Sequence, residues 1–155
     1  MCLRFCHAAI ALILSALLSS CSFAGAGLFT PTKVYDVRDL TVLADVRVPK
    51  AVIVGTDSRI AAAIAATLPR PEAPPVVLSV RIGSYRPDIS PLNRRSEATV
   101  TVTAVSVIDG SPVATATFPV TSGTENPDFE AEAIAEAVAA RIRSLFVLSM
   151  PSARQ

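Results

Sequence analysis

The sequence predicts an α+β fold, a two-layer sandwich in which two helices cover one face of a four-stranded mixed sheet. Apolar and polar residues alternate along four segments, as they do in half-buried strands. Two other segments repeat apolar residues every three or four positions, which is typical of helices with one buried face. The predicted order is strand, helix, three strands and helix, and its strand-helix-strand start implies a parallel pair joined by a crossover.

The first predicted strand and helix fill the segment before Pro69. Residues 34–54 are rich in Val, Leu and Ile, so we expect one strand there, or two short ones interrupted at Pro49. Gly55-Thr56-Asp57 then predicts a helix start, because Thr and Asp side chains can cap free amide groups. The buried stripe of this helix would recur every four residues, at Ile60, Ile64 and Leu68.

Alternating patterns predict three further strands, over residues 76–85, 96–108 and 113–121. The apolar phase changes near Ala104, which indicates a bulge. Asp109-Gly110 is a strong signal for a hairpin turn between the last two strands. Pro119 has no amide hydrogen to donate to a neighbour, so we expect its strand at the edge of the sheet.

The last helix is predicted to begin at Asn126-Pro127-Asp128, a capping residue followed by a proline in the first turn. Each predicted helix has a single apolar stripe, so both can lie on one face of the sheet. The other face is rich in Thr, Ser and Arg, which suits a solvated surface. The buried stripe of the last helix would consist of Ile134, Val138, Ile142 and Leu145.

The segment before this domain has the parts of a bacterial export signal. Arg4 supplies the positive charge, and residues 5–18 form an apolar run that is too short to cross a hydrocarbon core of about 30 Å as a helix. Leu18-Ser19-Ser20-Cys21 closes the run and resembles the lipobox of bacterial lipoproteins. The alternatives are an ordinary secretory signal cleaved near Ala24 or Ala26, or a short signal anchor.

The resemblance to bacterial lipoproteins covers residues 1–21. It implies cleavage before Cys21, a diacylglyceryl thioether on its sulfur and an acyl group on its amine. In that family Ser22, directly after the cysteine, implies export to the outer membrane rather than retention in the inner membrane. The expected organisation is a signal peptide over 1–20, a lipidated flexible tether over 21–33, a periplasmic domain over 34–148 and a frayed tail over 149–155.

The mature chain would lack the residues that most catalytic chemistry needs. Cys2, Cys6 and the single histidine, His7, leave with the signal, and the lipid occupies Cys21. No thiol or imidazole then remains for a zinc site, a Cys–His pair or a serine triad. Without Arg4, 13 basic residues face 13 acidic ones, a balance that argues against nucleic-acid binding. We therefore expect no enzyme, no metal, no cofactor and no nucleic-acid partner.

A basic cluster near the loop over residues 86–95 is the main candidate contact site. Its guanidinium groups could bind lipid phosphates, phospholipid headgroups or an acidic protein. The alternative is solvated charge, with Asp88 and Glu97 as local partners. The cluster consists of Arg81, Arg86, Arg94 and Arg95.

Two further groups of residues admit both a functional and a structural interpretation. Residues 55–59 could bind an anion at a helix N-terminus, although a capped helix start is the simpler interpretation. Three acidic residues of the last helix could supply paired carboxylates, but on an outward face they would simply favour solubility. These residues are Glu130, Glu132 and Glu136.

The predicted layout is similar to that of small periplasmic lipoprotein domains, including the lipopolysaccharide-assembly lipoprotein and the N-terminal domain of TolB, over about residues 34–147. The resemblance implies a non-catalytic, lipid-anchored protein that binds or scaffolds an envelope assembly. A lipid- or lipopolysaccharide-handling transport auxiliary lipoprotein is the alternative. Close packing of the helices favours a scaffold, whereas a void between the helices and the sheet favours a carrier.

Overall fold

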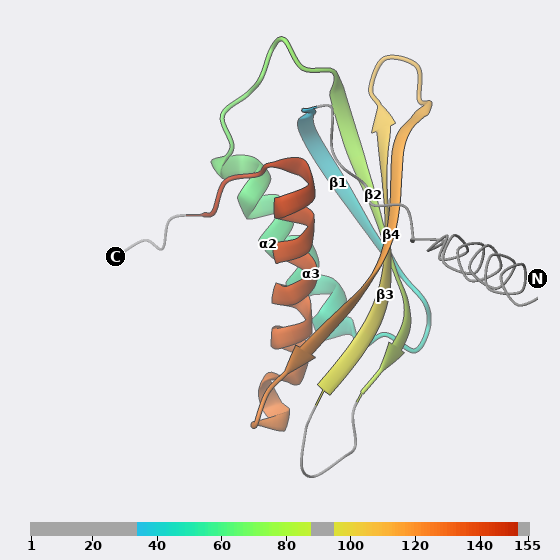
Figure 1. Ribbon diagram of the computed structural model, residues 1–155, viewed down its shortest axis with the longest axis vertical. Helices are drawn as coiled ribbons and strands as arrows, with labels where there is room; N and C mark the ends of the chain where they lie inside the picture. The colour runs from blue at the N-terminus through green and yellow to red at the C-terminus, as the bar shows by residue number, and fades with distance from the viewer. Residues whose placement is uncertain (1–33, 88–94, 152–155) are drawn as a thin grey trace, which may run out of the picture.

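The computed structural model describes residues 34–87 and 95–151, and it confirms the predicted α+β fold (Figure 1). Two helices lie on one face of a four-stranded sheet whose strand order is β1-β2-β3-β4. The lipobox, the tether, Asp88 and Arg94 lie outside the described residues. The elements are β1 (Asp36–Ala44), α2 (Lys50–Ala66), β2 (Pro75–Arg86), β3 (Arg95–Ser106), β4 (Pro112–Gly123), the short 3-10 helix η1 (Pro127–Phe129) and α3 (Glu130–Phe146).

The pairing of the strands matches the predicted mixed sheet. β1 runs parallel to β2. β2 pairs antiparallel with β3, and β3 pairs antiparallel with β4. The register between β3 and β4 shifts at Ala104/Val105, where the bulge was expected. Gly110 adopts a φ of 71° in the turn that joins these strands, a conformation that glycine allows without steric cost. β4 is an edge strand, as Pro119 predicted.

The core lies between the sheet and the helices. The inward residues of β2 are fully buried, as the alternation predicted, and those of β3 are at most 3% exposed. Asn126 accepts a hydrogen bond from the amide of Asp128 and caps η1, which leads directly into α3. The predicted stripe of α3 is buried in full. These core residues are Val76, Leu78, Val80 and Ile82 of β2, Ala98, Val100, Val102 and Ala104 of β3, and Ile134, Val138, Ile142 and Leu145 of α3.

The predicted start of the first helix is wrong. The chain turns after β1, where the amide of Val48 donates to the carbonyl of Asp45, and α2 begins at Lys50 directly after Pro49. Residues 51–54 are therefore helical, not a second short strand. A continuous apolar run fits a buried helix as well as a strand, so its periodicity could not distinguish them. The face that α2 buries consists of Val52, Thr56, Ile60 and Ala63.

Two consequences follow from the earlier helix start. Residues 55–59 lie in the middle of α2, so they offer no helix N-terminus for an anion. Leu68 lies beyond the end of the helix at Ala66 and is 82% exposed, so it is not part of the buried stripe. An apolar side chain is therefore exposed in the loop between α2 and β2.

Candidate functional site

Charged side chains gather where β2 leads toward β3, on the sheet face that the helices leave open. Two of them follow β1 in the turn before α2, two belong to β2 and one belongs to β3. Three of them line a hollow of about 670 Å³, which is formed by residues 44–47 and 84–86. We name this group the Arg86 surface, and it consists of Asp45, Arg47, Arg81, Arg86 and Glu97.

A bulge in β2 directs Arg86 to this open face. The register with β3 shifts between Gly83 and Arg86, and Ser84 has a φ of 35°. Strict alternation from the buried Ile82 would turn Arg86 toward the helices. The extra residue instead turns Tyr85 toward α3 and leaves Arg86 exposed beside Glu97, its partner in the register. Bulges commonly re-aim a side chain in this way.

Part of the charge at the Arg86 surface is already paired. A guanidinium nitrogen of Arg81 lies 2.8 Å from Oδ1 of Asp45, and the two side chains are 67% and 44% exposed. An ion pair this exposed contributes about 0–1 kcal/mol, so it orients the side chains more than it stabilises the fold. Arg86 and Arg47 remain exposed beside the hollow, where they can contact a carboxylate or a phosphate.

Of the four predicted arginines, the structure places Arg81 and Arg86 on the Arg86 surface. Arg95 is the first residue of β3 and is exposed at the same end of the sheet, while Arg94 lies outside the described residues. Arg47 was not predicted because it precedes the loop by about 40 residues, and only the parallel pairing of β1 with β2 brings it near Arg86.

A second polar cluster joins the sheet to α3 and was not predicted. The hydroxyl of Tyr85 donates to Oε1 of Glu130 over 3.1 Å, and the buried hydroxyl of Ser96 donates to the same oxygen. Burial raises the pKa of the Tyr85 phenol, and the neighbouring Glu130 raises it further, while the hydrogen bond with Ser96 acts in the opposite direction. Glu130 therefore holds the two layers together and does not simply favour solubility.

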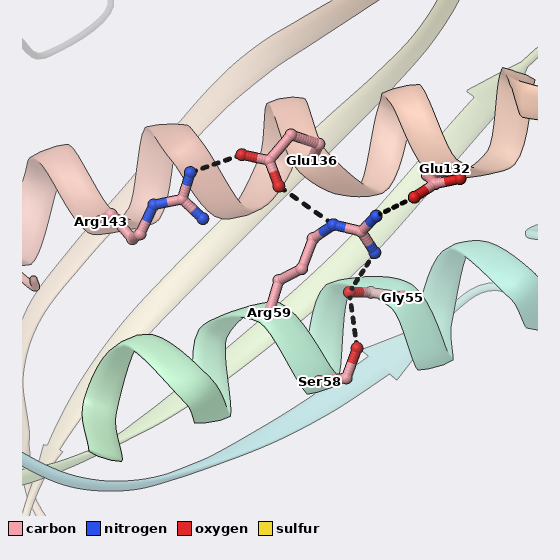
Figure 2. A network of polar contacts seen from close by, with 6 residues as sticks. All are labelled: Gly55, Ser58, Arg59, Glu132, Glu136 and Arg143. Carbon is pink, nitrogen blue, oxygen red and sulfur yellow. Dashed lines mark hydrogen bonds and ion pairs between the residues drawn. The ribbon is translucent and has the colours of Figure 1, made fainter. Parts of the chain in front are cut away.

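The other two acidic residues form an ion-pair network between the helices (Figure 2). Arg59 of α2 donates to Glu132 over 2.8 Å and to Glu136 over 3.0 Å, both on α3. Arg143, whose side chain is 9% exposed, pairs with the second oxygen of Glu136 at 2.5 Å. The expectation that these acids only favour solubility is therefore wrong. The two carboxylates also occupy Arg59, which argues further against an anion site at residues 55–59.

The fold is similar to that of known proteins, although no family model and no curated protein matches the sequence. A Xanthomonas campestris protein of the family DUF330 is 15% identical, with a TM-score of 0.50, over 73% of this chain and 82% of that one. The likeness shows the fold alone.

Two further solved structures are similar at lower TM-scores, which support no statement about function. The PelC dodecamer of Paraburkholderia phytofirmans is 18% identical, with a TM-score of 0.49, over 79% of this chain and 92% of that one. A minor lipoprotein of Acinetobacter baumannii is 11% identical, with a TM-score of 0.39, over 78% of this chain and 99% of that one. Solved structures similar to this fold thus include a lipoprotein.

The described residues hold neither a metal centre nor a transmembrane helix. Across 34–87 and 95–151, no three His, Cys, Asp or Glu side chains are grouped so that they could hold a metal ion. No helix in the same part of the chain is both long enough and apolar enough to cross a membrane.

The environment of Tyr85 predicts how its phenol titrates with pH. The chain has two tyrosines, so a Tyr35→Phe variant reports Tyr85 alone. We expect its absorbance titration to have a midpoint above the ordinary value of about 10. Because the folded pKa is raised, the contribution of Tyr85 to stability is complete below about pH 10 and is lost as the pH rises through the folded pKa. A midpoint at or below 10 in a chain that is still folded by circular dichroism would contradict this environment.

Proposed function

We propose that this chain is a lipoprotein whose domain binds or scaffolds an envelope assembly at the periplasmic face of the outer membrane, without catalysis of its own. The observation that carries the proposal is the run Leu18-Ser19-Ser20-Cys21 at the end of the apolar N-terminal segment. A lipid on Cys21 would fix the location, and Ser22 favours the outer membrane. The domain would then supply the contact surface.

The packing between the helices favours a scaffold over a lipid carrier. A Cβ atom added to Gly55 of α2 would lie 3.0 Å from the Cβ of Ala135 on α3, so the two helices are in direct contact. Val52, Ile60 and Ile134 are fully buried against the sheet. The hollow beside the Arg86 surface is lined by residues of turns and strand ends, not by this core. An acyl chain would have to displace packed side chains.

The open face of the sheet is the proposed contact surface. Hydroxyl side chains align across all four strands, at Thr41, Ser79, Thr103 and Thr115. In the next row, the hydroxyls of Thr101 and Thr117 lie 2.9 Å apart. A polar face of this kind needs no apolar cover, and the Arg86 surface at one end adds groups that can pair with an acidic partner.

Photo-crosslinking in cells tests this proposal. The crosslinker replaces Thr121, which is exposed and lines a hollow of about 220 Å³ together with Arg86. We expect a protein adduct that decreases about tenfold when Arg86, Arg94 and Arg95 are all changed to Gln, a loss of about 1.4 kcal/mol of binding free energy. The matched control, Arg141→Gln, removes a charge from the helix layer and should leave the adduct unchanged.

Two outcomes would count against the proposal. If the triple variant gave the same yield of adduct as the parent, the Arg86 surface would not be part of the contact with the partner. Phospholipid or lipopolysaccharide that co-purifies with the mature protein in stoichiometric amount, detected by mass spectrometry, would favour the carrier function instead.

A further inference from the structure

Exposed apolar side chains gather at one end of the domain. Leu68 and Ile108 are each 82% exposed, in the loop after α2 and in the turn between β3 and β4. The first described residue, Val34, is 48% exposed at the same end. We name this group the apolar end, and it consists of Val34, Leu68, Val107, Ile108, Val113 and Val147.

Hydrogen bonds hold these segments together. The amide of Val107 donates to the carbonyl of Pro75 over 3.1 Å, and the amide of Asp36 donates to Pro74 over 3.1 Å. Arg70 donates to the carbonyl of Val147 over 2.9 Å, which ties the loop after α2 to the end of α3. Figure 1 shows these loops at the end of the sheet opposite the one where β2 ends and β3 begins. The apolar end is therefore built from four linked segments: the chain before β1, the loop after α2, the β3–β4 hairpin and the end of α3.

The two ends of the domain differ in chemistry. The Arg86 surface presents charged groups of both signs beside a hollow, whereas the apolar end presents branched aliphatic side chains. The charges near the apolar end have both signs, and Arg38 and Asp36 pair there at 2.6 Å. Exposed apolar groups that cluster in this way mark a surface for a protein or a membrane.

The point at which the chain enters the domain favours a membrane, rather than a protein, as the partner of the apolar end. Val34 is 13 positions after Cys21, so a fully extended connection reaches at most about 45 Å. The strands of 12 residues are each about 40 Å long. Because the connection enters the domain at Val34, the apolar end is the part of the domain that the anchor holds closest along the chain, at most about 45 Å from a membrane that holds Cys21. The Arg86 surface could reach it only if the connection ran nearly straight back along the whole domain.

We propose that the apolar end docks on the phospholipid headgroup region of the membrane that holds Cys21, with Leu68 and Ile108 inserted, so that the Arg86 surface faces away from that membrane. This docking rests on the lipid anchor of the proposed function. A tethered domain meets its membrane at high effective concentration, so a weak apolar contact is sufficient to orient it. Because the nearby charges have both signs, docking should change little with salt concentration.

Site-specific labels test the docking on the mature lipidated protein. The mature lipidated protein has no free thiol, because Cys2 and Cys6 leave with residues 1–20 and the sulfur of Cys21 is in a thioether. A single added cysteine is therefore the only position that a polarity-sensitive fluorophore labels. The test variant is Ile108→Cys, and the matched control is Val46→Cys, which is also exposed but lies in the turn beside the Arg86 surface. Both are reconstituted in vesicles of phosphatidylethanolamine and phosphatidylglycerol that contain a lipid-borne nitroxide quencher.

We expect a blue shift and quenching at position 108 and neither at position 46, with little change at high salt. Leu68→Asp in the Ile108→Cys background should reduce both signals. Protein that floats with the vesicles is anchored. If the fluorophores at positions 108 and 46 of such protein reported the same environment, whether water or lipid, the docking would be overturned and the anchor would stand. Protein that neither floats nor carries acyl mass would remove the anchor and the docking together. Protection of position 108 in native envelopes but not in lipid vesicles would also overturn it, in favour of a protein partner.

Discussion

Replacing Cys21 by Ser is expected to release the protein from membranes. Each methylene of an acyl chain contributes about 0.8 kcal/mol when it is buried in lipid, so several chains anchor stably where one would be marginal. Serine has no sulfur for the thioether, so the variant would carry no diacylglycerol. Cell fractionation should find the unmodified protein in membranes and the variant in the soluble fraction or retained as an uncleaved precursor. Labelling with palmitate should be lost at the same time.

The adjacent change Ser22→Ala serves as a control, since it leaves the cysteine in place. This variant should keep both the membrane fraction and the palmitate label. If Cys21→Ser stayed with the membranes as a processed chain, another feature of the protein would hold it there, and the lipid anchor would not be the cause of its location.

Gly55→Leu is expected to destabilise the folded domain by about 2 kcal/mol. Even a bare Cβ at this position would lie 3.0 Å from the Cβ of Ala135 and 3.1 Å from a guanidinium nitrogen of Arg59. The rest of the leucine side chain would separate α2 from α3 and displace Arg59 from its carboxylates. Overpacking of this kind costs about 1–3 kcal/mol, and the loss of the ion pairs offsets part of the gain in helix propensity. Denaturant unfolding measures the difference.

Ala61→Leu is the matched control, because it adds the same side chain to an exposed position of α2. Its free energy of unfolding should lie within about 0.5 kcal/mol of the parent. If Gly55→Leu were as stable as Ala61→Leu, the helices would not be in the close contact described here.

The strands were predictable because a half-buried sheet imposes a period of two on the sequence. Val76 to Ile82 and Ala98 to Ala104 show this period without interruption, and both runs are buried as expected. The start of α2 was not predictable, because Ala51-Val52-Ile53-Val54 is apolar at every position. Only the turn at Asp45 and the packing of Val52 against the core decide for a helix.

The polar clusters depend on contacts that sequence spacing does not reveal. Arg59 and Glu136 are 77 residues apart, and Tyr85 and Glu130 are 45 apart. A phase change at Gly83-Ser84 is the local signal that Tyr85 turns inward and Arg86 outward. The close approach of α2 to α3 at Gly55 likewise depends on a contact that sequence spacing does not reveal.

The proposed location of the protein depends on the lipid on Cys21, and the mass of the mature N-terminus reports that lipid. The protein is purified from membranes with detergent and analysed intact and after digestion. We expect a chain that begins at Cys21, lacks residues 1–20 and carries the added mass of a diacylglyceryl group and an amide-linked acyl chain. A chain that begins near Ala24 or Ala26, or one that keeps residues 1–20 and an unmodified Cys21, would contradict it.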